Sequence, residues 1–174
     1  RTHEPETREH LASAHDELTR VAQIIRELAD FTRQDGGTAT IDVNEVLRAA
    51  LTLARYAHQG ARMTVVFEPD PRLLPLVGGR NSLLDVFLHL VLHAYETMSG
   101  DEGRLQVVSE ARGEEILVFF EEMGASPPPA AALARCRCIV AEDLGGTIVV
   151  EGVRSTVRLP IRPKQRRDHC NTLA

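Results

Sequence analysis

The sequence has no tryptophan, only two tyrosines and five phenylalanines, and three cysteines among its 174 residues. Three cysteines cannot form the disulfide framework of a small secreted domain, and no export signal opens the chain, so we expect a reducing cytoplasm. We expect Cys136 and Cys138 to be small buried side chains. The longest apolar stretch, residues 83–98, is interrupted by charged and His side chains, which excludes a membrane span in this chain.

Basic residues are also fewer than acidic residues. There are 20 Lys and Arg against 25 Asp and Glu, a net charge of −5, which argues against a nucleic-acid partner. Residues 161–174 hold four basic residues and one acidic residue, so this tail carries +3 and the preceding 160 residues carry −8. We interpret the tail as a solvated, flexible terminus, with a docking strip as the alternative.

An apolar stripe at heptad spacing predicts one long helix over residues 4–34. Such a helix must bury its stripe against a partner, and a symmetric homodimer supplies one; packing on its own domain is the alternative. Asp35, Gly36 and Gly37 end the helix, which makes residues 1–37 the first domain. The residues expected at the dimer interface are Leu11, Leu18, Val21, Ile25 and Leu28.

Residues 38–160 predict a second domain of helices and antiparallel strand pairs. Asp42 followed by Glu45 is typical of a helix start, and the prolines of residues 69–75 predict a loop. This order of elements favours an α+β fold, a two-layer sandwich with helices on one face of a mixed sheet. We expect helices over residues 42–58, 81–98 and 130–144, and extended segments over residues 38–41, 63–67, 104–111, 115–121, 147–151 and 155–160.

Four segments in the right order resemble the C-terminal part of a bacterial sensor histidine kinase. Residues 26–33 (RELADFTR) are similar to the end of the second dimerisation helix, and residues 41–47 (IDVNEVL) to the opening of the catalytic domain. Residues 85–98 are similar to its N-box helix, and residues 142–148 to the helix end and strand after its G2 box. The resemblance implies a dimerisation helix followed by a Bergerat-type ATP-binding sandwich.

The nucleotide-binding positions depart from the family pattern. The two Asn of the N box fall on His89 and His93, and the resemblance implies that His93 replaces an oxygen ligand of Mg²⁺, an ion that prefers oxygen to imidazole nitrogen. The Asp that reads adenine becomes Glu122, which is one methylene longer. Gly124 matches the first glycine of the same box, while Ser126 replaces the second.

The phosphate-binding segment departs further. In the family, backbone N–H groups of a glycine-rich turn hold the phosphates at a helix N-terminus. Here residues 127–129 are three prolines, which carry no N–H, and no glycine lies between Gly124 and Gly145. The family's ATP and Mg²⁺ are therefore expected to be lost, with no cofactor in their place, and autophosphorylation with them.

Asp85, His89, His93 and Glu96 stand four, four and three residues apart, so they share one face of a helix. By the resemblance this face lines the former nucleotide site. One interpretation is a cleft floor whose polar groups satisfy one another or water. The alternative is a Zn²⁺ site in which His89 and His93 are joined by a carboxylate.

We therefore interpret the chain as a degenerate histidine-kinase-like protein that acts through protein–protein contacts in a two-component pathway, with a response regulator or another signalling protein as partner. An alternative is a histidine phosphotransfer protein, in which His15, followed by Asp16 and Glu17, is the phosphoacceptor. A third reading is an active kinase with a divergent ATP site.

Overall fold

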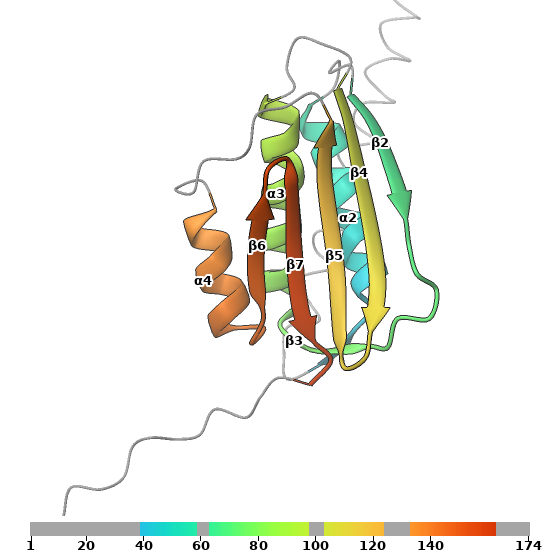
Figure 1. The fold of residues 1–174 in the computed structure, drawn as a ribbon, viewed down its shortest axis with the longest axis vertical. Coiled ribbons are helices and arrows are strands. Elements are labelled where there is room, and N and C mark those ends of the chain that lie inside the picture. Colours follow the sequence, from blue (N-terminus) through green and yellow to red (C-terminus); the bar gives the residue numbers. More distant parts are fainter. Residues whose placement is uncertain (1–38, 59–62, 98–102, 124–132, 163–174) are drawn as a thin grey trace, which may run out of the picture. The chain divides into compact units, whose positions relative to one another are not determined.

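The computed structural model describes residues 39–58, 63–97, 103–123 and 133–162 (Figure 1). The chain divides into two units, Arg1–Gly36 and Gly37–Ala174, and all described residues belong to the second. The predicted dimer stripe, His15, Gly124 and the end of the basic tail lie outside the described residues. Those predictions stay predictions.

The described part holds three helices, α2 (Val43–Ala57), α3 (Arg80–Thr97) and α4 (Ala134–Glu142). Helix α2 begins where the sequence predicts, because Oδ1 of Asp42 accepts hydrogen bonds from the backbone N–H groups of Asn44 (2.8 Å) and Glu45 (3.2 Å). Helix α4 starts later than predicted, at Ala134. Only Cys136 and Val140 are buried within it, so the expected burial of Cys138 is wrong: that thiol is exposed.

Five strands form the main sheet in the order β2-β4-β5-β7-β6. Strand β2 pairs with β4 in parallel, and the other neighbours are antiparallel, which confirms the mixed sheet. Gly113 and Gly152, at φ of 64° and 60°, turn the two tight hairpins, a conformation that side chains disfavour. The strands are β2 (Met63–Glu68), β4 (Gly103–Arg112), β5 (Glu115–Met123), β6 (Thr147–Glu151) and β7 (Arg154–Pro160).

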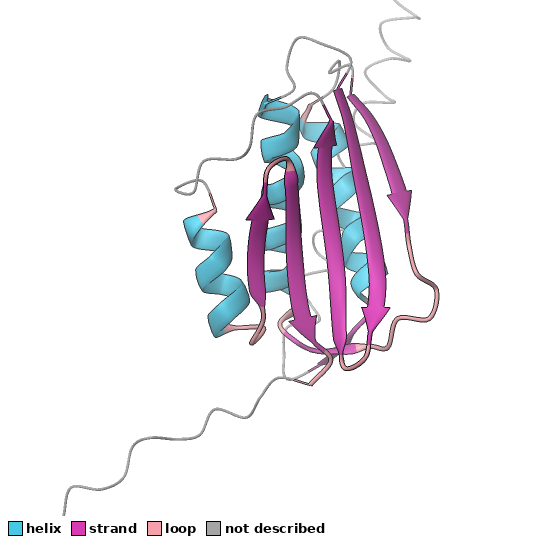
Figure 2. Ribbon diagram, in the orientation of Figure 1, coloured by secondary structure: helices cyan, strands magenta, loops and turns pink. Residues whose placement is uncertain are grey.

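The core lies between one face of this sheet and the helices behind it (Figure 2). Alternate residues of the central strands, such as Leu105, Val107 and Ile116, are fully buried. They meet the apolar face of α3, where the rings of Phe87 and Phe120 lie 5.8 Å apart. Each fully buried side chain of this kind contributes about 1.5–3 kcal/mol. The predicted two-layer α+β sandwich is confirmed.

One pair of strands was only half predicted. The expected extended segment at residues 38–41 is β1 (Ala39–Ile41), and it pairs antiparallel with β3 (Leu76–Gly78), which the sequence does not predict. Three residues are too few to show a strand periodicity. Ile41 and Leu76 are nevertheless buried almost completely, so this short sheet contributes to the core.

Candidate functional site

The predicted polar stripe lies on α3 as expected, but its four side chains have different surroundings. His89 and Glu96 are exposed, whereas Asp85 and His93 are half-buried. Oδ2 of Asp85 accepts a hydrogen bond from Nη2 of Arg135 at 2.7 Å, which links α3 to the start of α4. His93 instead lies near the end of β5. The stripe is thus divided between two neighbouring elements.

The end of β5 places a carboxylate inside the domain. Glu122 is only 4% exposed, because it lies two residues after the buried Phe120 on β5 and so faces the helices as Phe120 does. Its Oε2 accepts a hydrogen bond from Oγ1 of Thr97 at 3.2 Å. Its Oε1 lies 3.9 Å from Nδ1 of His93, and its backbone N–H donates to the carbonyl of Val153 at 3.0 Å. His93, Thr97 and Glu122 form what we call the α3–β5 cluster.

Burial is the main electrostatic influence on this cluster. Loss of water around Glu122 raises the pKa of its carboxyl, and the nearby His93 and the Thr97 hydroxyl oppose that rise. Burial has the larger effect because a charged carboxylate needs several hydrogen-bond donors to replace its water. The cluster therefore makes Glu122 a weaker acid than an exposed glutamate.

The structure brings together His93 and Glu122, two of the site residues that the sequence predicts. Thr97 was not predicted as a member. Its signal was present in the sequence, because Thr97 lies four residues after His93 and so shares its helix face.

The described residues offer little support for a metal centre. In residues 39–58, 63–97, 103–123 and 133–162, no group of three or more His, Cys, Asp or Glu side chains is placed to hold a metal ion. The alternative of a Zn²⁺ held by His89, His93 and a carboxylate therefore lacks a complete ligand set in this part of the chain.

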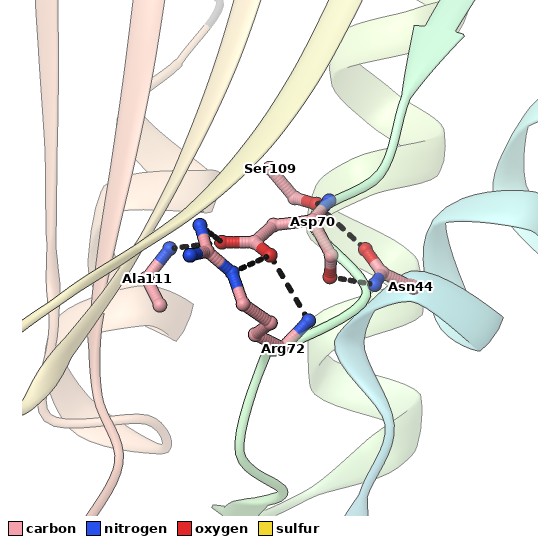
Figure 3. A network of polar contacts seen from close by, with 5 residues as sticks. All are labelled: Asn44, Asp70, Arg72, Ser109 and Ala111. Atoms are coloured by element: carbon pink, nitrogen blue, oxygen red, sulfur yellow. Dashed lines mark hydrogen bonds and ion pairs between the residues drawn. The ribbon is translucent and has the colours of Figure 1, made fainter.

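A second polar cluster lies where the β2–β3 loop meets α2 and β4 (Figure 3). The buried Asn44 donates from Nδ2 to the carbonyl of Asp70 at 2.9 Å. The buried Ser109 hydroxyl donates to Oδ1 of Asn44 at 2.7 Å and accepts from the backbone N–H of Asp70 at 3.0 Å. These bonds satisfy backbone groups of the loop, so the cluster fixes the loop rather than offering free groups to a ligand.

The side chain of Asp70 completes this second cluster. Its Oδ1 accepts from the backbone N–H of Arg72 at 2.9 Å and from Nε of Arg72 at 3.0 Å, and its Oδ2 lies 3.4 Å from the backbone nitrogen of Ala111 (Figure 3). Hydrogen bonds from Arg72 lower the pKa of Asp70 to about 2. This carboxylate is charged at neutral pH and engaged within the loop.

Solved structures of histidine kinases are similar to this chain. The nucleotide-free catalytic domain of histidine kinase ThkA has a TM-score of 0.65 and 22% identity, over 74% of this chain and 100% of that one. A mycobacterial sensor histidine kinase, MprB, has a TM-score of 0.60 and 16% identity, over 73% of this chain and 99% of that one.

A longer ThkA chain, solved in complex with the response regulator protein TrrA, matches with a TM-score of 0.63 and 22% identity. The match covers 91% of this chain and 52% of that one. No protein-family model and no curated protein matches the sequence. Likeness at these identities concerns the fold, and the fold of the second unit is that of a histidine kinase catalytic domain.

Proposed function

We propose that this chain is a histidine-kinase-like signalling protein that has lost ATP binding and acts through protein–protein contacts. The carrying observation is the engagement of Glu122, at the position of the adenine-reading Asp, with side chains of its own domain. Oε2 is hydrogen-bonded to Thr97 and Oε1 lies 3.9 Å from His93, while the side chain as a whole is buried. Adenine would have to displace these contacts.

The raised pKa of Glu122 adds to the difficulty. Adenine offers its amino group as a donor, and an ionised carboxylate accepts such a bond about twice as strongly as a neutral group does. Since burial raises the pKa of Glu122, keeping this carboxylate ionised inside the domain costs more than it would in water. The extra methylene of Glu122 also brings its carboxyl closer to α3 than an Asp would reach.

The remaining nucleotide contacts are weakened by residue type. At the position of the Mg²⁺ ligand, His93 supplies nitrogen, and its Nδ1 is directed to Glu122. The three prolines of residues 127–129, outside the described residues, provide no N–H for a phosphate. By the resemblance, the positions that would contact adenine, Mg²⁺ and the phosphates are thus all altered in residue type.

A response regulator is the partner that we favour. ThkA, whose fold this chain shares, was solved with such a protein bound. We propose a cytoplasmic homodimer, associated through the predicted stripe from Leu11 to Leu28, that offers its surface to a response regulator. A response regulator bound by this chain would stay unphosphorylated, because a chain that does not bind ATP forms no phosphohistidine from which a phosphoryl group could be transferred.

Calorimetric titration with ATP and Mg²⁺ tests the loss of binding. We expect no heat of binding at millimolar ATP for the full chain, while an ATP-binding histidine kinase domain serves as the positive control. The double variant His93→Asn with Glu122→Asp tests whether those two residues alone block the nucleotide. Micromolar binding by the unchanged chain would overturn the proposal and favour the divergent active kinase.

The phosphotransfer alternative rests on the spacing of His15, Asp16 and Glu17. A phosphorylated receiver domain incubated with the full chain would then transfer phosphate to it, and His15→Ala would abolish the acid-labile product. We expect no transfer. Transfer that depends on His15 would replace the proposed scaffold role with a relay.

A further inference from the structure

The two edges of the main sheet differ in what lies beside them. Beyond β6 lies α4, whose buried Val140 accepts a hydrogen bond through its carbonyl from the N–H of Gly146 just before the strand (Figure 1). At the other edge, β2 pairs only with β4 among the described strands, and α2 lies behind the middle of the sheet (Figure 1). A helix beside an edge strand hinders pairing with another chain, and β2 has no such cover in the described part.

Strand β2 is also unusually apolar for an edge. The pairing of Val65 with Leu105 and of Phe67 with Val107 places Val65 and Phe67 on the helix-facing side. Thr64, Val66 and Glu68 therefore face the opposite side. Edge strands in soluble proteins are usually short, charged or interrupted by proline. Six residues with a single charge, at Glu68, meet none of these conditions before Pro69.

We propose that β2 pairs antiparallel with β2 of a second copy of this chain, with Val66 opposite the partner's Val66. In this register Val65 lies opposite the partner's Phe67, so apolar side chains meet on the helix-facing side. Thr64 lies opposite the partner's Glu68 on the other side. The two main sheets then become one continuous sheet around a two-fold axis, the usual symmetry of homodimers.

Charge complementarity favours this register, and it favours a second copy of this chain as the partner. Arg104 of β4 lies beside Thr64 in the β2–β4 register; it is exposed and makes no ion pair with the described residues. Glu68 accepts one hydrogen bond, from Nε2 of Gln106 at 2.9 Å, through Oε1. In the proposed dimer Arg104 and the partner's Glu68 flank the small Thr64, about two strand spacings or 9.6 Å apart between backbones. Long side chains span that distance, and the two-fold axis creates the pair twice.

Other pairings lose these contacts. A shift that places Val65 opposite the partner's Val65 puts Thr64 opposite Val66 and carries the partner's Glu68 away from Arg104. A one-residue slip places helix-facing side chains opposite the outer ones. The inference goes beyond the proposed function, because it does not depend on whether the chain binds ATP or a response regulator.

Disulfide trapping in the full chain tests the pairing. Val66→Cys, in a background with Cys138→Ser and Cys170→Ser, should form a cross-linked dimer under mild oxidation, because residues opposite each other across an antiparallel pair lie about 4.5–5.5 Å apart at Cβ. Thr64→Cys is the matched control: it is on the same strand and face but opposite Glu68, so it should not cross-link. Cross-linking reports on β2 whether or not the N-terminal helix also associates.

Charge variants of the Val66→Cys chain give a second measurement. Arg104→Glu should lower the yield of the Val66→Cys cross-linked dimer about tenfold, because two attractive pairs become repulsive. Adding Glu68→Arg reverses both signs and should restore the yield to within about threefold. Absence of the Val66→Cys dimer, equal cross-linking of Thr64→Cys, or a yield that is indifferent to Arg104→Glu would each overturn the proposal.

Discussion

Nδ1 of His93 lies 3.9 Å from Oε1 of the buried Glu122, so the last turns of α3 and the end of β5 meet at this pair of side chains. By the resemblance these are the positions of the Mg²⁺ ligand and of the adenine-reading carboxylate. In this chain the two side chains face each other inside the domain. The contact links the end of α3 to the end of β5.

Replacing Glu122 by Gln should change how stability depends on pH. Burial raises the folded-state pKa of Glu122 above the ordinary value of 4.5, so its favourable contribution is present below that pH and is lost as pH rises through the folded pKa. Gln cannot ionise. We therefore expect Glu122→Gln to gain stability relative to the unchanged chain as pH rises from about 4.5 to 8. Urea unfolding at several pH values measures this, and parallel stability curves for the two proteins would contradict it.

Asp70→Asn should show the opposite dependence. Hydrogen bonds from Arg72 lower the folded-state pKa of Asp70 from 3.8 to about 2, so its contribution is present above the unfolded pKa of 3.8 and is lost as pH falls through about 2. The variant should therefore be less stable near neutral pH, with the deficit shrinking below pH 4. Arg72→Ala is the control, since it should remove most of the same pH-dependent difference. A deficit that is constant down to pH 2 would argue against an ionised Asp70 as its source.

The parts of the fold that could be predicted are those with strong local signals. Asp42 caps α2 as its side chain and position indicate, and the apolar run around Phe87 gives α3 to within one residue at each end. Strand β3 could not be predicted, because Leu76, Val77 and Gly78 are three residues whose strand conformation depends on pairing with β1.

The sequence points to two of the three residues of the α3–β5 cluster, but not to the contacts between them. The resemblance aligned His93 with the Mg²⁺ ligand and Glu122 with the adenine-reading Asp, yet the pairing of the two side chains depends on how α3 crosses β5, which is a tertiary relationship. The second polar cluster escaped prediction for the same reason: Asn44, Asp70 and Ser109 are far apart in sequence and meet only in the fold.

Asn44→Ala should destabilise the domain by about 1–3 kcal/mol. The substitution removes the partner of the Asp70 carbonyl and of the buried Ser109 hydroxyl, and a buried polar group left without a partner costs free energy of that order. Thermal and urea unfolding measure the loss. Ser109→Ala combined with Asn44→Ala supplies the double-mutant cycle, and we expect the double variant to lose less than the sum of the singles. Strict additivity would show that the two side chains act independently.

Gly146→Ala should be the more damaging of two glycine substitutions. A Cβ at Gly146 would overlap the backbone carbonyl oxygen of Arg158 in β7, where only backbone movement can relieve the overlap. We expect a loss of at least about 3 kcal/mol. Gly152→Ala is the matched control at the hairpin turn: its Cβ meets nothing within 4 Å, but φ of 60° costs about 1 kcal/mol for a residue with a side chain. Urea unfolding of both variants compares them. Equal losses of stability would mean that the backbone of β7 moves at Arg158 to accept the new Cβ. Close packing of the turn between α4 and β6 would then not be the reason for glycine at Gly146.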